Sequence, residues 1–240
     1  MMDRVSAVLF DMGGTLRTRI EDPAMRREAL EELKRLLDYR GDPEELSDHL
    51  SKGAAAYKRW AEETLHEAPE EEIWARWMTP EIPAERVQEL SVQLEHLWRA
   101  TQGRRVVRPD AKRVVSELEA RGYELGVISN TTSREAVPRG LREYGLAEHF
   151  PVVVLSSTSG YRKPGTRIFA LATDALGVDP GACAYVGDRP SRDVVGARAA
   201  GFAMTVLIHG DAMQFKEDVN GCPPADHTIE TLSELLDIFE

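Results

Sequence analysis

The sequence is poor in cysteine and has no long apolar run. Its two cysteines, Cys183 and Cys222, have no histidine or further cysteine at the spacing of zinc ligands. We therefore expect reduced thiols in a cytoplasmic protein, with neither a disulfide scaffold nor a zinc site. The apolar run Val5 to Phe10 is too short for a secretory signal. No run approaches the ~20 apolar residues of a membrane span, so no membrane association is expected.

Positive charge is in the minority. The chain has 30 Lys and Arg against 41 Asp and Glu, which gives a formal net charge of -11 at pH 7. Such a charge repels nucleic acid, so nucleic acid is not expected as a partner, and any anionic substrate would need a locally positive site. The length of 240 residues fits one α/β domain with a modest inserted domain. No feature of the sequence indicates the oligomeric state.

Residues from about 17 to 101 are expected to be helical. Asp22-Pro23 and Asp42-Pro43 each place an N-cap residue before a proline at the first helical position. Glu45 is positioned to close a capping box in the second case. Apolar residues recur at helical spacing after both starts, and further helices are expected around 73–78 and over 83–99. Four amphipathic helices in series predict a small helical bundle.

The remainder of the chain alternates between strands and helices. Strands are expected at 5–10, 123–129, 152–155, 183–186 and 203–208, and helices at 110–121, 133–144, 164–176, 191–200 and 231–239. This order predicts right-handed crossovers and a parallel, Rossmann-like sheet. The predicted fold class is thus α/β, with a core of residues 1–16 and 102–240 and an inserted helical domain of residues 17–101.

Polar side chains gather near the carboxyl ends of the predicted strands. Asp11, Ser129-Asn130 and Asp188 lie at strand ends, Lys163 begins the helix after the third strand, and Asp193 lies in the first turn of the helix after Asp188. The carboxyl ends of parallel strands meet at one edge of a sheet, so three carboxylates and one ammonium should converge. Carboxylates that close repel one another, and oxygen ligands of this kind select Mg²⁺. A phosphate could then bridge the metal, Lys163 and the backbone amides of the Gly13-Gly14 turn.

Four motifs in this order resemble those of the haloacid-dehalogenase-like (HAD) superfamily. The first is the run Asp11-Met12-Gly13-Gly14-Thr15, where the family usually reads D-x-D-G-T. Ile128-Ser129-Asn130 resembles the second motif, and Tyr161-Arg162-Lys163-Pro164 with Ile168-Phe169 the third. The run from Val186 to Asp193 is similar to the fourth. The insertion after the first motif resembles the helical C1-type cap of this family, which closes over the site.

The resemblance implies a role for each matching residue. Asp11 would be the nucleophile that forms an aspartyl-phosphate, and Lys163 would neutralise charge on it and in the transition state. Mg²⁺ would be held by Asp11, Asp188 and the carbonyl of Gly13, with Asp193 in support. Thr15 or Ser129 would bind phosphoryl oxygens, with Gly14 and Asn130 also expected at the phosphate. The implied activity is hydrolysis of a small phosphorylated metabolite.

One residue departs from the family pattern. Phosphatases of the family usually carry an Asp two residues after the nucleophile as general acid and base, and this chain has Gly13. Glycine cannot transfer a proton, and general acid–base catalysis contributes ~10²–10⁴-fold. Three interpretations stay open: a phosphatase whose proton transfer comes from elsewhere, a 2-haloacid dehalogenase, or a phosphate- or metabolite-binding regulatory protein that has lost turnover. Asp188 and Asp193 argue for metal and against the dehalogenase.

Two further groups allow two interpretations each. All four tryptophans fall in the helical insertion, where they fill a bundle core or line a substrate pocket. Arg17 and Arg19 lie at the start of that insertion, either as a solvated hinge or as ligands of an anionic substrate.

Overall fold

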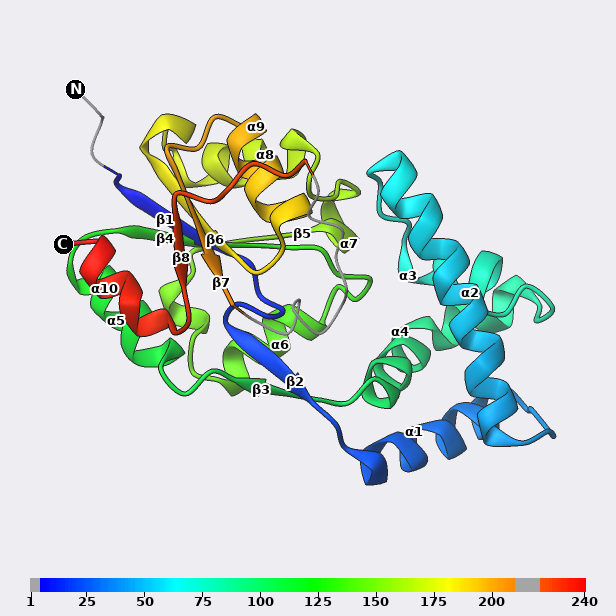
Figure 1. Ribbon diagram of the computed structural model, residues 1–240. Coiled ribbons are helices and arrows are strands. Elements are labelled where there is room, and N and C mark those ends of the chain that lie inside the picture. The colour runs from blue at the N-terminus through cyan, green and yellow to red at the C-terminus, as the bar shows by residue number, and fades with distance from the viewer. Residues whose placement is uncertain (1–4, 210–220) are drawn as a thin grey trace.

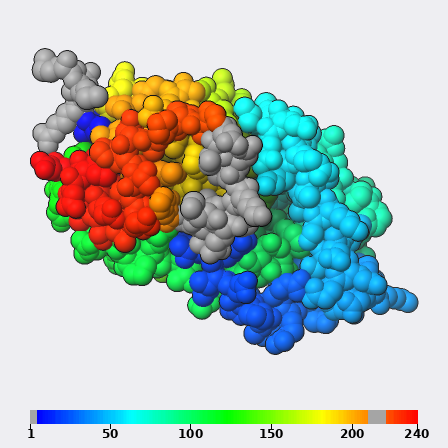
Figure 2. All heavy atoms as spheres, in the orientation of Figure 1, coloured from blue at the N-terminus to red at the C-terminus, as the bar shows by residue number. Residues whose placement is uncertain are grey.

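The computed structural model describes residues 5–209 and 221–240, so residues 1–4 and 210–220 of the predicted core lie outside the described residues. The described chain forms a sheet domain and a helical unit that lie side by side (Figure 1). Figure 2 shows them as two lobes of one elongated body. No helix of the described residues is both long and apolar enough to cross a membrane.

The main sheet has six parallel strands in the described part of the chain, in the spatial order β5-β4-β1-β6-β7-β8. These strands are β1 (Ala7–Phe10), β4 (Glu124–Ser129), β5 (Val152–Leu155), β6 (Cys183–Gly187), β7 (Met204–Ile208) and β8 (His227–Ile229). The chain continues from β1 toward one side of the sheet and from β6 toward the other. Their carboxyl ends therefore form the topological switch point, where such sheets bind ligands. The predicted α/β, Rossmann-like core is confirmed.

Helices cover both faces of this sheet (Figure 1). They are α5 (Ala111–Ala120), α6 (Ala136–Glu143), α7 (Ser156–Ser159), α8 (Thr166–Leu176), α9 (Val195–Ala199) and α10 (Leu235–Ile238). Val8 and Phe10 of β1 pack with the apolar residues of α5, α6 and α10. Ala7 and Leu9 point to the opposite face and pack with those of α8 and α9. This alternation buries β1 on both faces.

The helical unit, residues 23–101, has a core of its own. It consists of α1 (Pro23–Leu36), α2 (Pro43–Thr64), α3 (Glu70–Ile73), a π-helical turn (Trp74–Met78) and α4 (Ala84–Thr101). Trp74 is fully buried in this core, and the rings of Trp60 and Trp77 lie 5.1 Å apart. The packing favours the bundle-core interpretation of the tryptophans.

The prediction that residues 17–101 are helical throughout was wrong at its start. Arg17–Ile20 form a strand, β2, which pairs antiparallel with β3 (Arg104–Val107). This two-stranded ribbon links the helical unit to the sheet domain (Figure 1). Neither strand was predicted, because charged residues interrupt the apolar pattern that marks a strand.

Several predicted helix ends also differ from the structure. The helix expected at 133–144 spans Ala136–Glu143, and that expected at 191–200 begins with a π-helical turn at Pro190–Val194. The closing helix begins with a 3₁₀ turn at Leu232–Glu234. At α2 the Asp42 side chain accepts from the backbone N–H of Glu44, so Glu45 does not close the expected capping box. Cap residues and short turns set such boundaries more than apolar periodicity does.

Candidate active site

Asp11 and Asp188 lie side by side because their strands are paired. Phe10 of β1 is in register with Val186 of β6, and each aspartate follows its strand at the same edge of the sheet. The backbone N–H of Asp11 donates to the carbonyl of Val186 over 2.8 Å. Asp11 is 4% and Asp188 5% exposed, so both carboxylates are nearly out of contact with water. They flank the switch point of the sheet.

Lys163 is the counter-charge of this site. Its side chain is fully buried, and its Nζ lies 2.7 Å from Asp11 Oδ1 and 2.7 Å from Asp193 Oδ1. Nζ also donates to the Tyr185 hydroxyl over 2.7 Å and to the Ile128 carbonyl over 3.0 Å. One buried ammonium thus orients two carboxylates at once, and its contact with Asp11 is to Oδ1 of that carboxylate.

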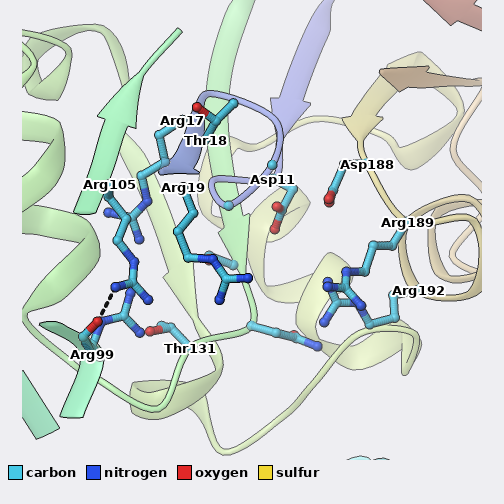
Figure 3. A pocket seen from close by; sticks show the side chains of 14 residues that line it. Asp11, Arg17, Thr18, Arg19, Arg99, Arg105, Thr131, Asp188, Arg189 and Arg192 are labelled. Carbon is cyan, nitrogen blue, oxygen red and sulfur yellow. Dashed lines mark hydrogen bonds between the residues drawn. The ribbon is translucent and has the colours of Figure 1, made fainter. Parts of the chain in front are cut away.

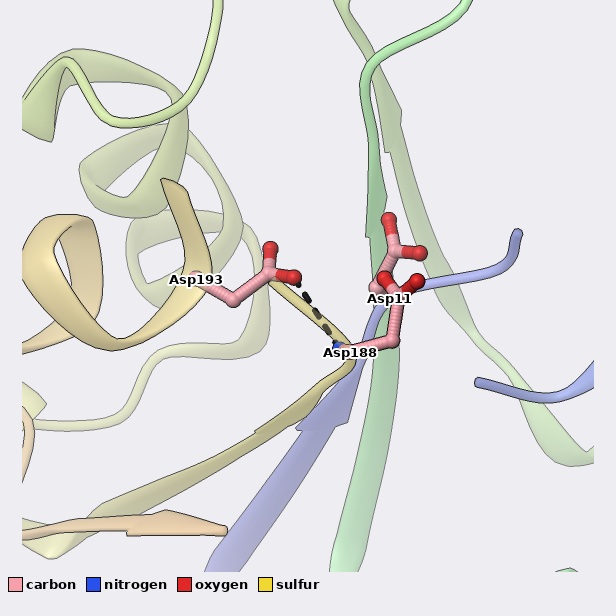
Figure 4. A group of neighbouring side chains, drawn as sticks. All are labelled: Asp11, Asp188 and Asp193. Carbon is pink, nitrogen blue, oxygen red and sulfur yellow. Dashed lines mark hydrogen bonds between the residues drawn. The ribbon is translucent and has the colours of Figure 1, made fainter. Parts of the chain in front are cut away.

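Asp193 shapes the loop that carries Asp188. Its Oδ2 accepts from the backbone N–H groups of Asp188 and Arg189 over 3.2 and 2.9 Å (Figure 4). Burial alone would raise the pKa of Asp193, but the charges of Lys163 and Arg192 outweigh burial and hold that pKa below its ordinary value. Asp193 is therefore an ionised carboxylate that holds the backbone of the Asp188 loop through hydrogen bonds.

Asp188 is compensated less completely, because the charges of Arg192 and Arg189 do not outweigh its burial and its acidic neighbours. Its Oδ1 is buried and has no hydrogen-bond partner among the described residues. Burial, reinforced by the negative charges of Asp11 and Asp193, raises the pKa of Asp188 to about 8. Carboxylate oxygens of the three aspartates lie within 4.8 Å of one another. An orphaned oxygen among three carboxylates and one ammonium fits a hard divalent cation such as Mg²⁺.

The turn after Asp11 requires glycine at one position and leaves space at another. Gly14 has φ +89°, and a Cβ there would lie 2.1 Å from Asp188 Oδ2, so only glycine fits. A Cβ on Gly13 would have no atom within 4 Å. Thr15 is fully buried and its hydroxyl has no hydrogen-bond partner in the described residues, but it does not line the cavity beside Asp11.

Ser129 is the last residue of β4 and Asn130 follows it, and both line that cavity. Ser129 is 4% exposed. The Asn130 side chain binds the backbone of Lys163, accepting from its N–H and donating to its carbonyl over 2.9 Å each. Asn130 therefore positions Lys163, and only its second amide hydrogen remains to meet a ligand.

The cavity at this edge has a volume of about 220 Å³ and an arginine-rich wall (Figure 3). Its lining includes Arg17, Arg19, Arg99, Arg105, Arg189 and Arg192, together with Asp11 and Asp188. Sequence patterns singled out only the first two of these arginines. Arg189 directly follows Asp188 and Arg192 directly precedes Asp193, which is a signal that could have found them. Arg99 and Arg105 carry no such signal.

The helical unit is joined to the sheet domain next to Lys163. Glu67, which follows α2, accepts hydrogen bonds from Tyr57, from Arg162 and, over 2.6 Å, from Ser156. The Glu67 carboxylate is fully buried, and Arg162 precedes Lys163 directly. A contact that spans both units is thus one residue from the lysine that orients Asp11.

Comparison with known proteins decides the family. The sequence model of the haloacid dehalogenase-like hydrolases matches residues 5–201. The chain belongs to this family. The match contains all four motifs from which the resemblance was drawn, and the predicted HAD fold and hydrolase class are thereby confirmed.

The haloacid dehalogenase-like hydrolases most similar to the chain include two named phosphatases. The phosphoserine phosphatase of Thermus thermophilus is 33% identical over 221 residues, which cover 81% of this chain and 85% of that protein. The phosphoglycolate phosphatase of Chromobacterium violaceum is 30% identical over 240 residues, covering 100% and 98%. The crystal structure of a HAD phosphatase from Thermococcus onnurineus is 27% identical, has a TM-score of 0.65, and covers 98% of this chain and 97% of that one.

Proposed function

We propose that the chain is a Mg²⁺-dependent phosphatase of a small phosphorylated metabolite, with Asp11 as its nucleophile. The observation that carries this proposal is the pairing of Lys163-bound Asp11 with the orphaned oxygen of Asp188. That pair lies in a small cavity with an arginine-rich wall. The similarity to two phosphatases that are named for small phosphate monoesters supports it.

Asp11, Asp188 and the Gly13 carbonyl would hold the metal. Asp193 supports them through the loop of Asp188, because both of its oxygens are already engaged with Lys163 and backbone amides. Bound Mg²⁺ would neutralise the crowded carboxylates and the charge of a phosphoryl group. Lys163 and the amides of the Gly13-Gly14 turn would add positive potential on the same side.

The free oxygen of Asp11 would attack phosphorus. An O–P bond forms on Asp11, the ester oxygen leaves with the bonding electrons, and water then cleaves the aspartyl-phosphate to release inorganic phosphate. Lys163 fixes the other oxygen of Asp11 through both steps. Ser129, which lines the cavity, would donate to a phosphoryl oxygen.

Gly13 constrains which substrates are turned over well. It offers a carbonyl but no proton, so the leaving oxygen must depart as a stable anion or take its proton from solvent or from the substrate itself. Acyl and aryl phosphates meet the first condition. A halide leaving group needs no proton either, and this favours 2-haloacid dehalogenation as a second candidate. The Asp188 carboxylate, whose Oδ1 has no hydrogen-bond partner among the described residues, counts against that candidate, because a halide displacement gives it no role.

Hydrolysis of p-nitrophenyl phosphate and acetyl phosphate, with Mg²⁺ and with EDTA, tests the proposal. We expect turnover that EDTA removes and that Asp11→Asn abolishes, because an amide is a poor nucleophile. Asp237→Asn is the matched control, since it changes an exposed aspartate of α10. Turnover retained by Asp11→Asn would refute the mechanism. Metal-independent release of chloride from 2-chloropropionate, without phosphate hydrolysis, would establish the dehalogenase instead.

A further inference from the structure

Four of the cavity arginines come from the linker ribbon and the helical unit. Arg17 and Arg19 lie on β2, Arg105 lies on β3, and Arg99 lies in the last turn of α4. We call Arg17, Arg99 and Arg105 the arginine cluster. Figure 3 shows Arg99 and Arg105 on one side of Asp11, and Arg189 and Arg192 on the other. Positive charge therefore extends across the cavity, well beyond the part that a single phosphoryl group at Asp11 would occupy.

The guanidinium groups of Arg17, Arg99 and Arg105 have no carboxylate in direct contact among the described residues. None of them forms an ion pair with a carboxylate in the part of the chain that the structure describes. Arg17 and Arg105 donate instead to backbone carbonyls, those of Ala136 over 3.5 Å and Gly103 over 2.6 Å. The buried Nε of Arg17 has no hydrogen-bond partner among the described residues. Their positive charge is therefore available to a ligand.

Glu95 is an acidic side chain whose charge acts on both Arg99 and Arg105. It neutralises the positive charge of these arginines only weakly. It is 3% exposed, and its carboxyl accepts from the Thr132 hydroxyl over 2.5 Å instead of pairing with an arginine. Burial raises the pKa of Glu95, which weakens it as a counter-charge.

Without a bound anion, the arginine cluster is electrostatically unfavourable for the folded protein. Burial, followed by the charges of Arg99 and Arg17, lowers the pKa of Arg105 to about 9. Three like charges on the wall of one small cavity repel one another, and burial adds to the cost. In a chain with a net charge of -11 such a concentration of arginine does not arise from composition. A bound anion would relieve the repulsion and accept the unused donors.

We propose that Arg17, Arg99 and Arg105 bind a second anionic group of the substrate, a carboxylate or a second phosphate. This rests on the proposed function, in which the scissile phosphate lies at Asp11. The cavity is smaller than the ~300–1,000 Å³ of pockets for drug-sized ligands, so the two anionic groups are separated by a short spacer. The same arginines line a second cavity of about 550 Å³, which leaves room for further substrate atoms beyond the second anion.

Calorimetric binding of non-hydrolysable phosphonates tests this inference without needing turnover. The probes are carboxyalkyl phosphonates and alkylene bisphosphonates with spacers of two to four methylene groups, each compared with the alkylphosphonate of equal length in the presence of Mg²⁺. Charge-assisted hydrogen bonds predict about 10- to 100-fold tighter binding of the doubly anionic probe at the best spacer. Tighter binding of the carboxyalkyl phosphonates would identify the second anion as a carboxylate, and tighter binding of the bisphosphonates would identify it as a phosphate.

Arg99→Gln is the deciding variant, because no hydrogen bond of the described residues depends on the Arg99 guanidinium. It should lower the preference for the doubly anionic probe about tenfold or more. Arg99→Lys should restore part of that preference, because it returns the charge without the planar fork. Arg142→Gln, at an exposed arginine of α6, is the matched control and should keep the full preference.

Two results would overturn the inference: equal binding of the paired probes by the unmodified protein at every spacer, or an undiminished preference in Arg99→Gln. Absence of binding by every probe would count in the same way. Failure of the proposed function has a different signature. In that case the binding preference persists, while p-nitrophenyl phosphate is not hydrolysed with Mg²⁺.

Discussion

Replacing Gly13 by aspartate should turn a limited phosphatase into a more general one. An added Cβ at this position has no atom within 4 Å, and Gly13 does not have the positive φ that makes its neighbour Gly14 irreplaceable. The side chain would enter the cavity that Asp11 lines, where a leaving oxygen would be. A positioned acid–base group contributes ~10²–10⁴-fold, so kcat on alkyl phosphates should rise by about that factor. Aryl phosphates should gain far less, because their leaving groups need no proton.

The assay is a comparison of kcat for an alkyl phosphate and for p-nitrophenyl phosphate in Gly13→Asp, Gly13→Asn and the unmodified protein. Gly13→Asn is the matched control, since its side chain has the same shape but transfers no proton at neutral pH. A higher kcat in both variants would show that the added side chain acts by its shape or hydrogen bonding and not by proton transfer. No gain on alkyl phosphates in Gly13→Asp, with Mg²⁺ binding intact, would refute the idea that only the acid–base group is missing.

Three further predictions concern the charges around Asp11. Lys163→Met should abolish hydrolysis and lower the free energy of unfolding by about 3–5 kcal/mol, because it leaves buried carboxylates unpaired. Urea denaturation measures this free energy. A smaller loss in the presence of Mg²⁺ would show that the metal partly replaces the charge of Lys163. Gly14→Ala should weaken Mg²⁺ binding at least about tenfold, since its methyl displaces the Asp188 carboxylate, and unchanged affinity by calorimetry would contradict the crowding. The raised pKa of Asp188, about 8, means that Mg²⁺ must displace a proton below that pH. Apparent Mg²⁺ affinity should therefore fall toward pH 6, and without metal the folded state binds more protons than the unfolded state from about pH 4 to 8, so stability should decrease as pH rises through that window.

The parts of the fold that follow a local rule were predictable from the sequence. Strands of the main sheet such as β1 and β6 are short apolar runs, and the polar residues after them mark its carboxyl edge. β8 was missed because its three residues, His227–Ile229, carry too little apolar pattern. β2 and β3 were missed because their pairing joins segments more than eighty residues apart, and only their contact, not their sequence, makes them strands.

The same distinction divides the site. Asp11 and Asp188 could be placed from strand ends, and Asp193 from the first turn of the helix that follows. The structure brings their carboxylates together with Lys163. The bonds of Asn130 to the Lys163 backbone could not be foreseen, since an asparagine after a strand is equally suited to a turn. Arg99 could not be foreseen either, because an arginine at a helix end usually reflects favourable interaction with the helix dipole.

The ribbon of β2 and β3 is both the tether of the helical unit and a wall of the cavity. Arg19 and Arg105 are paired in its register, and Arg17 lies two residues before Arg19. The residues of a hinge are often small. If this ribbon served as a hinge, it would instead carry several of the charged residues that line the cavity. Any rotation of the helical unit about the ribbon would therefore change the electrostatic potential felt by an anion in the cavity. By linkage, an anion that binds most tightly at one orientation of the helical unit would stabilise that orientation, so substrate binding would itself favour the closed arrangement.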